Sequence, residues 1–292
     1  MIYDVHQHLS DDPGTPQAWR EAMHAAGVQG GALFSRPPLE NDMGGADFET
    51  RLAQVLAWCA GDEHTDPVLF IHPGEPDAIA HAQEAAARGI AAFKMICTNY
   101  RVGDERTLRL VSAIAALGKP IFFHTGIIWN KGNSSQYNRP AEWEALIDVP
   151  GLRFSMAHCS WPWYDECIAV YGKFLNGTAN AENAPEMFFD LTPGTPEIYR
   201  KDLLFKLFHV GYDVPNNILF GMDCVANHYA TDWLRHWLEI DNALYDEMKV
   251  PADIRRKIYH DNYLRFIGKT PQKVSRAALG QDSAVRWRLP DA

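Results

Sequence analysis

The chain begins MIYDVHQHLS at residues 1–10, an apolar run that ends in two histidines. If residues 2–8 form a β-strand, the side chains of Asp4, His6 and His8 share one face, because strand side chains alternate with a period of two. Two imidazoles on one face can bind one metal ion. A single His-x-His pattern is also typical of surface histidines near a terminus, so the rest of the chain has to decide.

Seven further apolar runs follow the first, at a spacing of about 30 residues. Each run is rich in branched and aromatic residues and is bounded by Gly, Pro or Asn, as buried strands are. The eight predicted strands are residues 2–8, 30–36, 67–73, 90–97, 120–126, 152–160, 187–193 and 217–223.

Amphipathic segments between these runs predict helices. Residues 15–26 begin with Thr15, an expected N-cap, and residues 75–89, 104–118 and 195–211 each end at a glycine, a frequent C-cap. Parallel strands need such crossover helices. Eight strand–helix units predict an α/β fold, a single closed (β/α)8 barrel of the TIM type. A doubly wound open sheet is the alternative, but the Gly-rich phosphate turn expected after one of its early strands is missing from the sequence.

No linker divides the chain, so we expect one domain over residues 1–292. The barrel is predicted at about 1–228, and a C-terminal helical extension with a polar tail at about 229–292. Within the extension, residues 229–247 and 251–267 predict helices, and the tail begins at Lys269.

Composition excludes several classes of protein. The formal net charge of −10 disfavours nucleic acid and anionic membrane surfaces as partners. No apolar run approaches the ~20 residues of a membrane helix, and the N-terminus lacks the pattern of a signal peptide. Five cysteines without close pairs indicate a reducing compartment, so we expect a cytoplasmic protein. The sequence is compatible with a homo-oligomer, since closed homo-oligomers are common among soluble enzymes.

Unusual polar residues stand where the predicted strands end. They are His6, His8, Lys94, His124, His158 and Asp223. The active site of a (β/α)8 barrel lies at the C-terminal ends of its strands, so we expect these side chains to meet there. Alternation also predicts that Phe154 and Met156 share the interior side with His158, and that Cys159 and Cys224 point outward.

Several motifs together resemble the amidohydrolase-related family of metal-dependent barrels, the second amidohydrolase family. They are YDVHQH (3–8), FKM (93–95), FHTG (123–126), MAHCS (156–160), FGMDC (220–224) and IYHDNYLRFIG (258–268). The resemblance covers most of residues 1–268. It implies a TIM barrel, a divalent metal that is usually zinc or manganese, and hydrolysis or non-oxidative decarboxylation of small carboxylated substrates.

The resemblance also implies roles for individual residues. His6, His8, His124 and Asp223 match the ligands of a single metal, a set that suits Zn²⁺, with Mn²⁺ as the alternative. His158 matches a histidine that faces the substrate. Asp223 and His158 are therefore the predicted catalytic residues, since Asp223 can take a proton from water and His158 can shuttle it.

Lys94 allows two hypotheses. In related barrels a carboxylated lysine at this strand bridges two metals, and Lys94 and His158 would then be additional ligands. Alternatively, Lys94 stays an ammonium group and binds a substrate carboxylate. A lysine without a bridge is common in this family, so one metal ion is favoured.

Residues that follow strand ends are candidates for substrate binding. Arg36 and Arg101 could anchor a carboxylate, and Trp129 and Trp161 could form a wall against a flat or cyclic small molecule. Packing over the barrel mouth explains the tryptophans equally well.

Three functions fit this pattern. The first is a hydrolase of a small lactone, ester or amide, and the second is a lyase that decarboxylates or hydrates a small carboxylic acid. The chain lacks the long insertions that decarboxylases of the family often carry, which favours the hydrolase. The third is a metal-free ligand-binding barrel, against which the intact ligand set argues, because unpaired buried histidines are costly.

Overall fold

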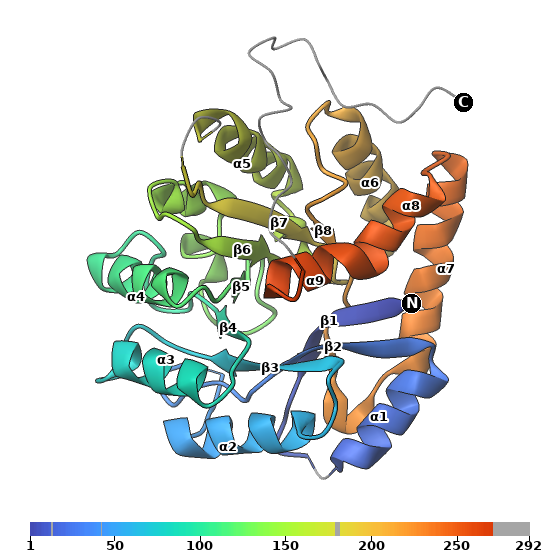
Figure 1. Ribbon diagram of the computed structural model, residues 1–292. Coiled ribbons are helices and arrows are strands. Elements are labelled where there is room, and N and C mark those ends of the chain that lie inside the picture. The colour runs from blue at the N-terminus through green and yellow to red at the C-terminus, as the bar shows by residue number, and fades with distance from the viewer. Residues whose placement is uncertain (13, 42, 179–181, 271–292) are drawn as a thin grey trace.

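The chain forms one curled parallel sheet with helices on its outer side (Figure 1). The computed structural model describes residues 1–12, 14–41, 43–178 and 182–270, so most of the predicted tail lies outside the described residues. The strands are β1 (Ile2–His8), β2 (Val28–Phe34), β3 (Thr65–Phe70), β4 (Ala92–Met95), β5 (Ile121–Phe123), β6 (Arg153–Met156), β7 (Glu186–Asp190), β8 (Ile218–Leu219) and β9 (Cys224–Val225). Each of the eight predicted runs contains or overlaps one of the strands β1 to β8.

The strand order is β8-β7-β6-β5-β4-β3-β2-β1-β9, and every pairing is parallel. β9 follows β8 in the chain after a four-residue interruption at 220–223, yet it pairs with β1. Within the interruption, the carbonyl of Phe220 accepts a 3.0 Å hydrogen bond from the amide of Val5. β8 and β9 therefore share the eighth barrel position and connect β7 to β1, which confirms the predicted TIM-type barrel.

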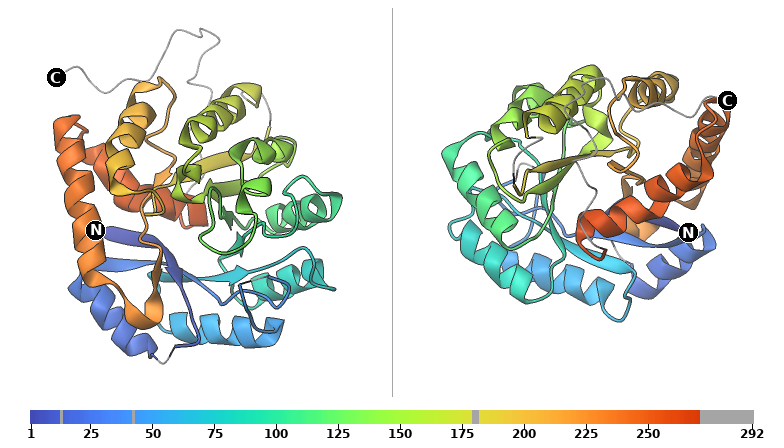
Figure 2. Two further views of the ribbon diagram at one scale, coloured as in Figure 1. Left: turned by 180° about the vertical axis from the view of Figure 1, so that it is seen from behind. Right: turned by 45° about the horizontal axis from the view of Figure 1, so that its top comes forward.

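The longer helices surround the sheet, as the two further views in Figure 2 also show. They are α1 (Pro16–Ala25), α2 (Phe48–Cys59), α3 (Ala78–Ala87), α4 (Glu105–Ala116), α5 (Tyr164–Gly177), α6 (Arg200–His209) and α7 (Thr231–Glu247). The chain then continues through α8 (Ala252–Arg256), a π-helical turn (Lys257–Asp261) and α9 (Asn262–Ile267). Between β5 and β6 the connection is a 3-10 helix, Pro140–Leu146, in place of an α-helix.

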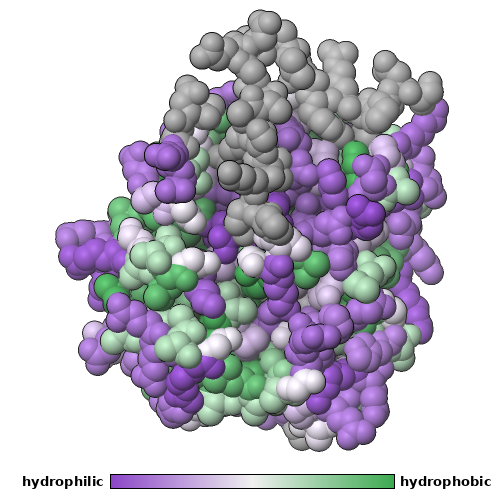
Figure 3. Space-filling view, in the orientation of Figure 1, coloured by the Kyte–Doolittle hydropathy of each residue, from purple (hydrophilic) through white to green (hydrophobic). Residues whose placement is uncertain are grey.

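Local sequence signals explain where several helices begin and end. Thr15 caps α1, because its hydroxyl oxygen accepts a 3.2 Å hydrogen bond from the amide of Ala18. Gly89 and Gly118 follow α3 and α4 with φ of +105° and +69°, a left-handed conformation that glycine adopts without a steric penalty. On the face seen in Figure 3, polar side chains alternate with hydrophobic ones.

Helix α9 closes the N-terminal end of the barrel. The ring of Phe266 lies 4.7 Å from the ring of Phe122 and 5.0 Å from that of Phe188, which belong to the interior cluster of the barrel. Asn262 donates 2.8 Å hydrogen bonds to the carbonyls of Pro215 and Ile218, where β8 begins. Asn262 and Phe266, both within the IYHDNYLRFIG motif (258–268), therefore form part of the floor of the barrel and leave the opposite end free for a site.

Alternation along β1 differs from the prediction. Tyr3 and Val5 belong to the interior cluster, and the register of β1 against β2 shifts between Asp4 and Gln7. Such an irregularity changes which residues face inward. The carboxylate of Asp4 instead accepts a hydrogen bond of 2.9 Å from the amide of Met222, so the prediction that Asp4 shares the face of His6 and His8 is wrong.

The predicted alternation of β6 is also wrong. The ring of Phe154 packs 5.2 Å from that of Phe174 on α5, and Met156 belongs to the same layer between sheet and helices. His158, Cys159 and Ser160 have φ of +58°, +44° and +61°, so the chain leaves the strand conformation directly after β6. The predicted outward positions of Cys159 and Cys224 are confirmed, because both lie in this layer as well.

In the described part of the chain, every helix is too short or too polar to cross a bilayer. That residues 1–292 form a single domain stays a prediction.

Replacing Phe266 by Ala tests the role of α9. We expect the free energy of unfolding to fall by about 3–5 kcal/mol, because the change leaves a cavity in the barrel floor. Denaturant unfolding measures the loss. The control Ile198→Ala changes a side chain that is 83% exposed and should stay within about 0.5 kcal/mol of the parent. Equal stability of the two variants would contradict the proposed floor.

Candidate metal centre

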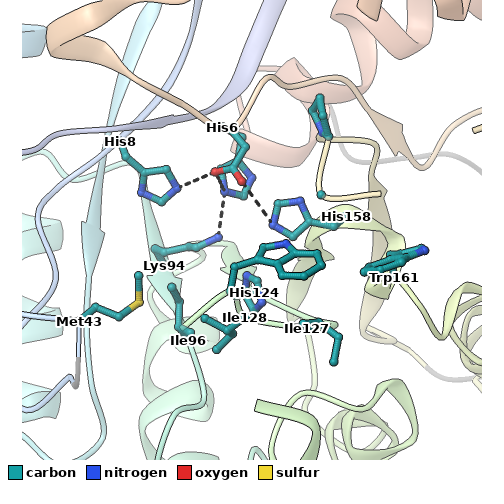
Figure 4. A pocket seen from close by; sticks show the side chains of 14 residues that line it. His6, His8, Met43, Lys94, Ile96, His124, Ile127, Ile128, His158 and Trp161 are labelled. Carbon is teal, nitrogen blue, oxygen red and sulfur yellow. Dashed lines mark hydrogen bonds and ion pairs between the residues drawn. The ribbon is translucent and has the colours of Figure 1, made fainter. Parts of the chain in front are cut away.

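A cavity of about 210 Å³ lies at the C-terminal ends of the barrel strands. Its polar lining comprises the six residues that the sequence places at strand ends: His6, His8, Lys94, His124, His158 and Asp223. In Figure 4 the side chains of His6, His8, Lys94 and His158 point toward one another. The predicted convergence of residues that are far apart in sequence is therefore observed.

His6, His8 and Asp223 form the tightest group. Oδ1 of Asp223 lies 3.5 Å from Nε2 of His6 and 3.2 Å from Nε2 of His8. One potential ligand atom from each residue lies within 4.8 Å of the other two. Two imidazole nitrogens and a carboxylate oxygen at this separation can share one divalent cation.

Asp223 reaches this position through an unusual backbone conformation. It lies between β8 and β9 with φ of +52°, a region that Asp tolerates better than most residues. Burial raises the pKa of its carboxyl group, but the neighbouring His6, His8 and His158 outweigh burial and hold that pKa well below the usual value. The carboxylate is therefore ionised at neutral pH, as a metal ligand must be.

Asp190, at the end of β7, orients the imidazole of His6. Its Oδ2 lies 2.8 Å from Nδ1 of His6, and both side chains are almost fully buried. Burial and then the charge of Lys94 lower the pKa of His6 to about 3, so the ring is neutral. A neutral ring that donates from Nδ1 keeps its lone pair on Nε2, the nitrogen that faces the pocket.

Asp190 was not among the site residues predicted from the sequence. The signal was present, because Asp190 interrupts the apolar run 187–193 as the other site residues interrupt theirs.

Lys94 lies inside the site and is completely buried. Its Nζ is 3.2 Å from Nε2 of His6, and burial lowers its pKa to about 8. A lysine with this pKa can bind a carboxylate as a cation or become neutral and react with carbon dioxide. Both hypotheses for Lys94 therefore stay predictions.

His124 and His158 also line the pocket, with ring centroids 5.1 Å apart. His124 lies outside the group of three ligands within 4.8 Å, so its role as a fourth ligand stays a prediction. Its Nε2 is buried and has no hydrogen-bond partner among the described residues. Nε2 of His158 lies 3.7 Å from Oδ2 of Asp223, and its Nδ1 lies 3.0 Å from Oγ1 of Thr192.

These donors fit a divalent metal. The buried Nε2 of His124 has no hydrogen-bond partner among the described residues, which points to a ligand there, because buried polar atoms are normally satisfied. Imidazole and carboxylate together suit zinc or manganese.

The predicted substrate-binding residues divide into two groups. Trp129 and Trp161 line the cavity, and their rings stack with centroids 5.7 Å apart. Arg36 is paired with Asp11, and Arg101 with Glu142. The structure does not bring either arginine to the cavity lining, so substrate contact through them stays a prediction without support from the geometry.

Comparisons with known proteins agree with this fold. No curated protein gives a significant match. Among solved structures, 2,6-dihydroxybenzoate decarboxylase from Rhizobium is 13% identical, with a TM-score of 0.64, 92% of this chain and 99% of that chain covered. Dihydroorotase from Campylobacter jejuni is 17% identical, with a TM-score of 0.57 and coverage of 93% and 84%. Amidohydrolase 2 from Bifidobacterium longum subsp. infantis is 15% identical, with a TM-score of 0.56 and coverage of 91% and 98%.

At these identities the three structures show a shared fold alone. A family model described as amidohydrolase matches residues 3–269, which is most of the chain. The protein therefore belongs to the second amidohydrolase family, as its strand-end motifs predict.

Proposed function

We propose that this protein is a metal-dependent hydrolase of a small lactone, ester or amide. The observation that carries the proposal is the meeting of His6, His8 and Asp223 beside His158 at the mouth of one cavity. Metal ligands alone would also suit a structural site. The adjoining cavity and the ionisable side chain of His158 favour a catalytic site over a structural one.

His6, His8 and Asp223, with His124 as the fourth ligand, would hold one divalent ion, Zn²⁺ or Mn²⁺. When bound, such an ion polarises a substrate oxygen and makes a water molecule more acidic. Asp223 is 34% exposed, so water can reach its carboxylate.

The two catalytic residues would move the proton. Asp223 accepts a proton from the attacking water on its carboxylate, which its low pKa keeps ionised. His158 lies within 3.7 Å of that carboxylate and can pass a proton from Nε2 to the leaving group. Thr192 contacts Nδ1 and limits rotation of the ring.

The cavity also restricts the substrate. Lys94 is the one lysine or arginine that lines it in the described part of the chain, so the site can neutralise one carboxylate. Most of the remaining lining is apolar and comprises Met43, Ile96, Ile127, Ile128, Trp129, Trp161 and Pro193. A volume of about 210 Å³ suits a small ring.

The apolar lining supports a second candidate, a metal-dependent lyase that decarboxylates a small acid. A carboxylate held against Ile96, Ile127 and Ile128 would lose solvation, which favours loss of neutral carbon dioxide. In that reaction His158 would protonate the carbon from which carbon dioxide leaves.

The cellular compartment of the enzyme and its partners are also part of the proposal. All five cysteines are buried and unpaired, which supports a reducing cytoplasm. The acidic net charge disfavours nucleic acid and anionic membrane surfaces as partners. A homo-oligomer is compatible with the proposal.

Isotope and gas measurements distinguish the two reactions. Metal-loaded protein is incubated in H₂¹⁸O with a panel of small lactones, esters and amides and of aromatic monocarboxylic acids. Hydrolysis predicts one ¹⁸O atom in the product carboxylate and no carbon dioxide. Carbon dioxide release without ¹⁸O in the product would reject the hydrolase in favour of the lyase. Asp223→Asn should abolish either reaction.

Ligand variants test the metal centre by elemental analysis of purified protein. The His8→Ala variant should lose most of the bound metal, because only two of the three clustered ligands remain to hold it. His124→Ala should lose metal and activity together if His124 is the fourth ligand. His236→Ala changes an exposed histidine on α7 and should keep both. Full metal content in His124→Ala would remove that residue from the ligand set.

A further inference from the structure

A buried ion pair outside the cavity joins α6 to α7, which lie side by side on one flank of the barrel (Figures 1 and 2). Nε and Nη2 of Arg200 each donate a 2.7 Å hydrogen bond to one carboxylate oxygen of Asp241. Arg200 is 1% exposed and Asp241 is fully buried. The guanidinium group also lies 5.2 Å from the ring of Trp237, which restricts its plane.

The remaining arm of Arg200 reaches the end of β7. Its Nη1 donates a 2.7 Å hydrogen bond to the carbonyl of Leu191. Leu191 lies between Asp190, which contacts Nδ1 of His6, and Thr192, which contacts Nδ1 of His158. The ion pair therefore holds Leu191, the residue between the hydrogen-bond partners of His6 and His158.

The segment that Arg200 holds has little freedom of its own. The amide of Leu191 donates to the carbonyl of Leu219 at 2.9 Å, and the amide of Thr192 donates to Oδ1 of Asp190 at 2.9 Å. Gly194 packs so closely on His158 that a Cβ there would lie 2.5 Å from Cγ of the ring. A displacement of the Leu191 carbonyl would therefore move the supports of both rings.

Stability alone does not explain this arrangement. A well-packed apolar pair of similar volume often stabilises a buried contact as well as an ion pair does. An apolar pair could join α6 to α7, but it could not donate to Leu191. A bidentate guanidinium with a third donor does both, and its planar shape fixes the direction of that donor.

We propose that Arg200 and Asp241 are positioning residues, which hold the Asp190–Thr192 segment so that His6 and His158 keep the ring orientation needed at the metal centre. This inference rests on the proposed metal-dependent function. It adds a support that lies outside the cavity and touches neither the substrate nor the metal.

The double variant Arg200→Met/Asp241→Leu removes the support without leaving a buried charge alone. Zn²⁺ affinity is measured by competition with a chromophoric chelator, on protein whose folded fraction is established by circular dichroism. We expect Zn²⁺ to bind about 10-fold more weakly, the lower end of the range for partners of metal ligands. Nitrogen NMR of the metal-free protein should show His6 change from one Nδ1-protonated tautomer to a mixture.

A second buried pair provides a matched control. Arg51 and Glu75 are 1% and 3% exposed, and Arg51 likewise donates to a strand-end carbonyl, that of Phe70 on β3. Within the described residues, neither β3 nor the turn that follows it contributes to the cavity lining. Arg51→Met/Glu75→Leu should therefore keep parental Zn²⁺ affinity and the single His6 tautomer, whatever stability it loses.

The outcomes separate the two claims. Parental affinity and tautomer in Arg200→Met/Asp241→Leu, or equal losses in both double variants, would overturn the positioning role. If the parent protein itself fails to bind Zn²⁺, the metal proposal fails, and the NMR signals of His6 still decide the positioning role. If the double variant does not fold, Arg200→Lys replaces it. A lysine cannot serve both Asp241 oxygens and Leu191, so unchanged affinity and tautomer there would equally overturn the proposal.

Discussion

The 2.8 Å contact between Nδ1 of His6 and Asp190 determines what the barrel mouth can do. It fixes the tautomer of a buried, neutral imidazole and leaves the lone pair of Nε2 facing the cavity. The contact links β1 to β7 across the eighth strand position, where Gly221 lies beneath it. A Cβ on Gly221 would lie 2.9 Å from Cβ of His6 and 2.7 Å from Cγ2 of Thr192, so this crossing requires glycine.

Barrel closure and site formation depend on the same interruption of the eighth strand. Phe220, the first residue of the interruption, accepts a hydrogen bond from β1, and β9 pairs with β1 after the interruption. Asp223 lies between them in a left-handed conformation, which directs its carboxylate toward His6 and His8. Helix α9 fills the opposite end, so the open end of the barrel is also the end where the six strand-end side chains of the cavity gather.

Much of this could be predicted because strand ends carry a strong signal. A polar residue that stops an apolar run marks the barrel mouth, and Asp190 gave the same signal as the residues that were recognised. The predictions for Asp4 and Phe154 were wrong because alternation assumes a regular strand, whereas β1 shifts register and the chain after β6 turns left-handed. The pairing of Arg36 and Arg101 with acidic residues distant in sequence depends on tertiary structure, which periodicity does not reveal.

Anomalous diffraction from crystals grown with Zn²⁺ tests the central claim most directly. The account predicts one peak about 2.0–2.2 Å from Nε2 of His6, Nε2 of His8 and a carboxylate oxygen of Asp223. The same maps would show whether His124 completes the set. A fully occupied Zn²⁺ elsewhere in the molecule, with none between His6 and Asp223, would contradict it.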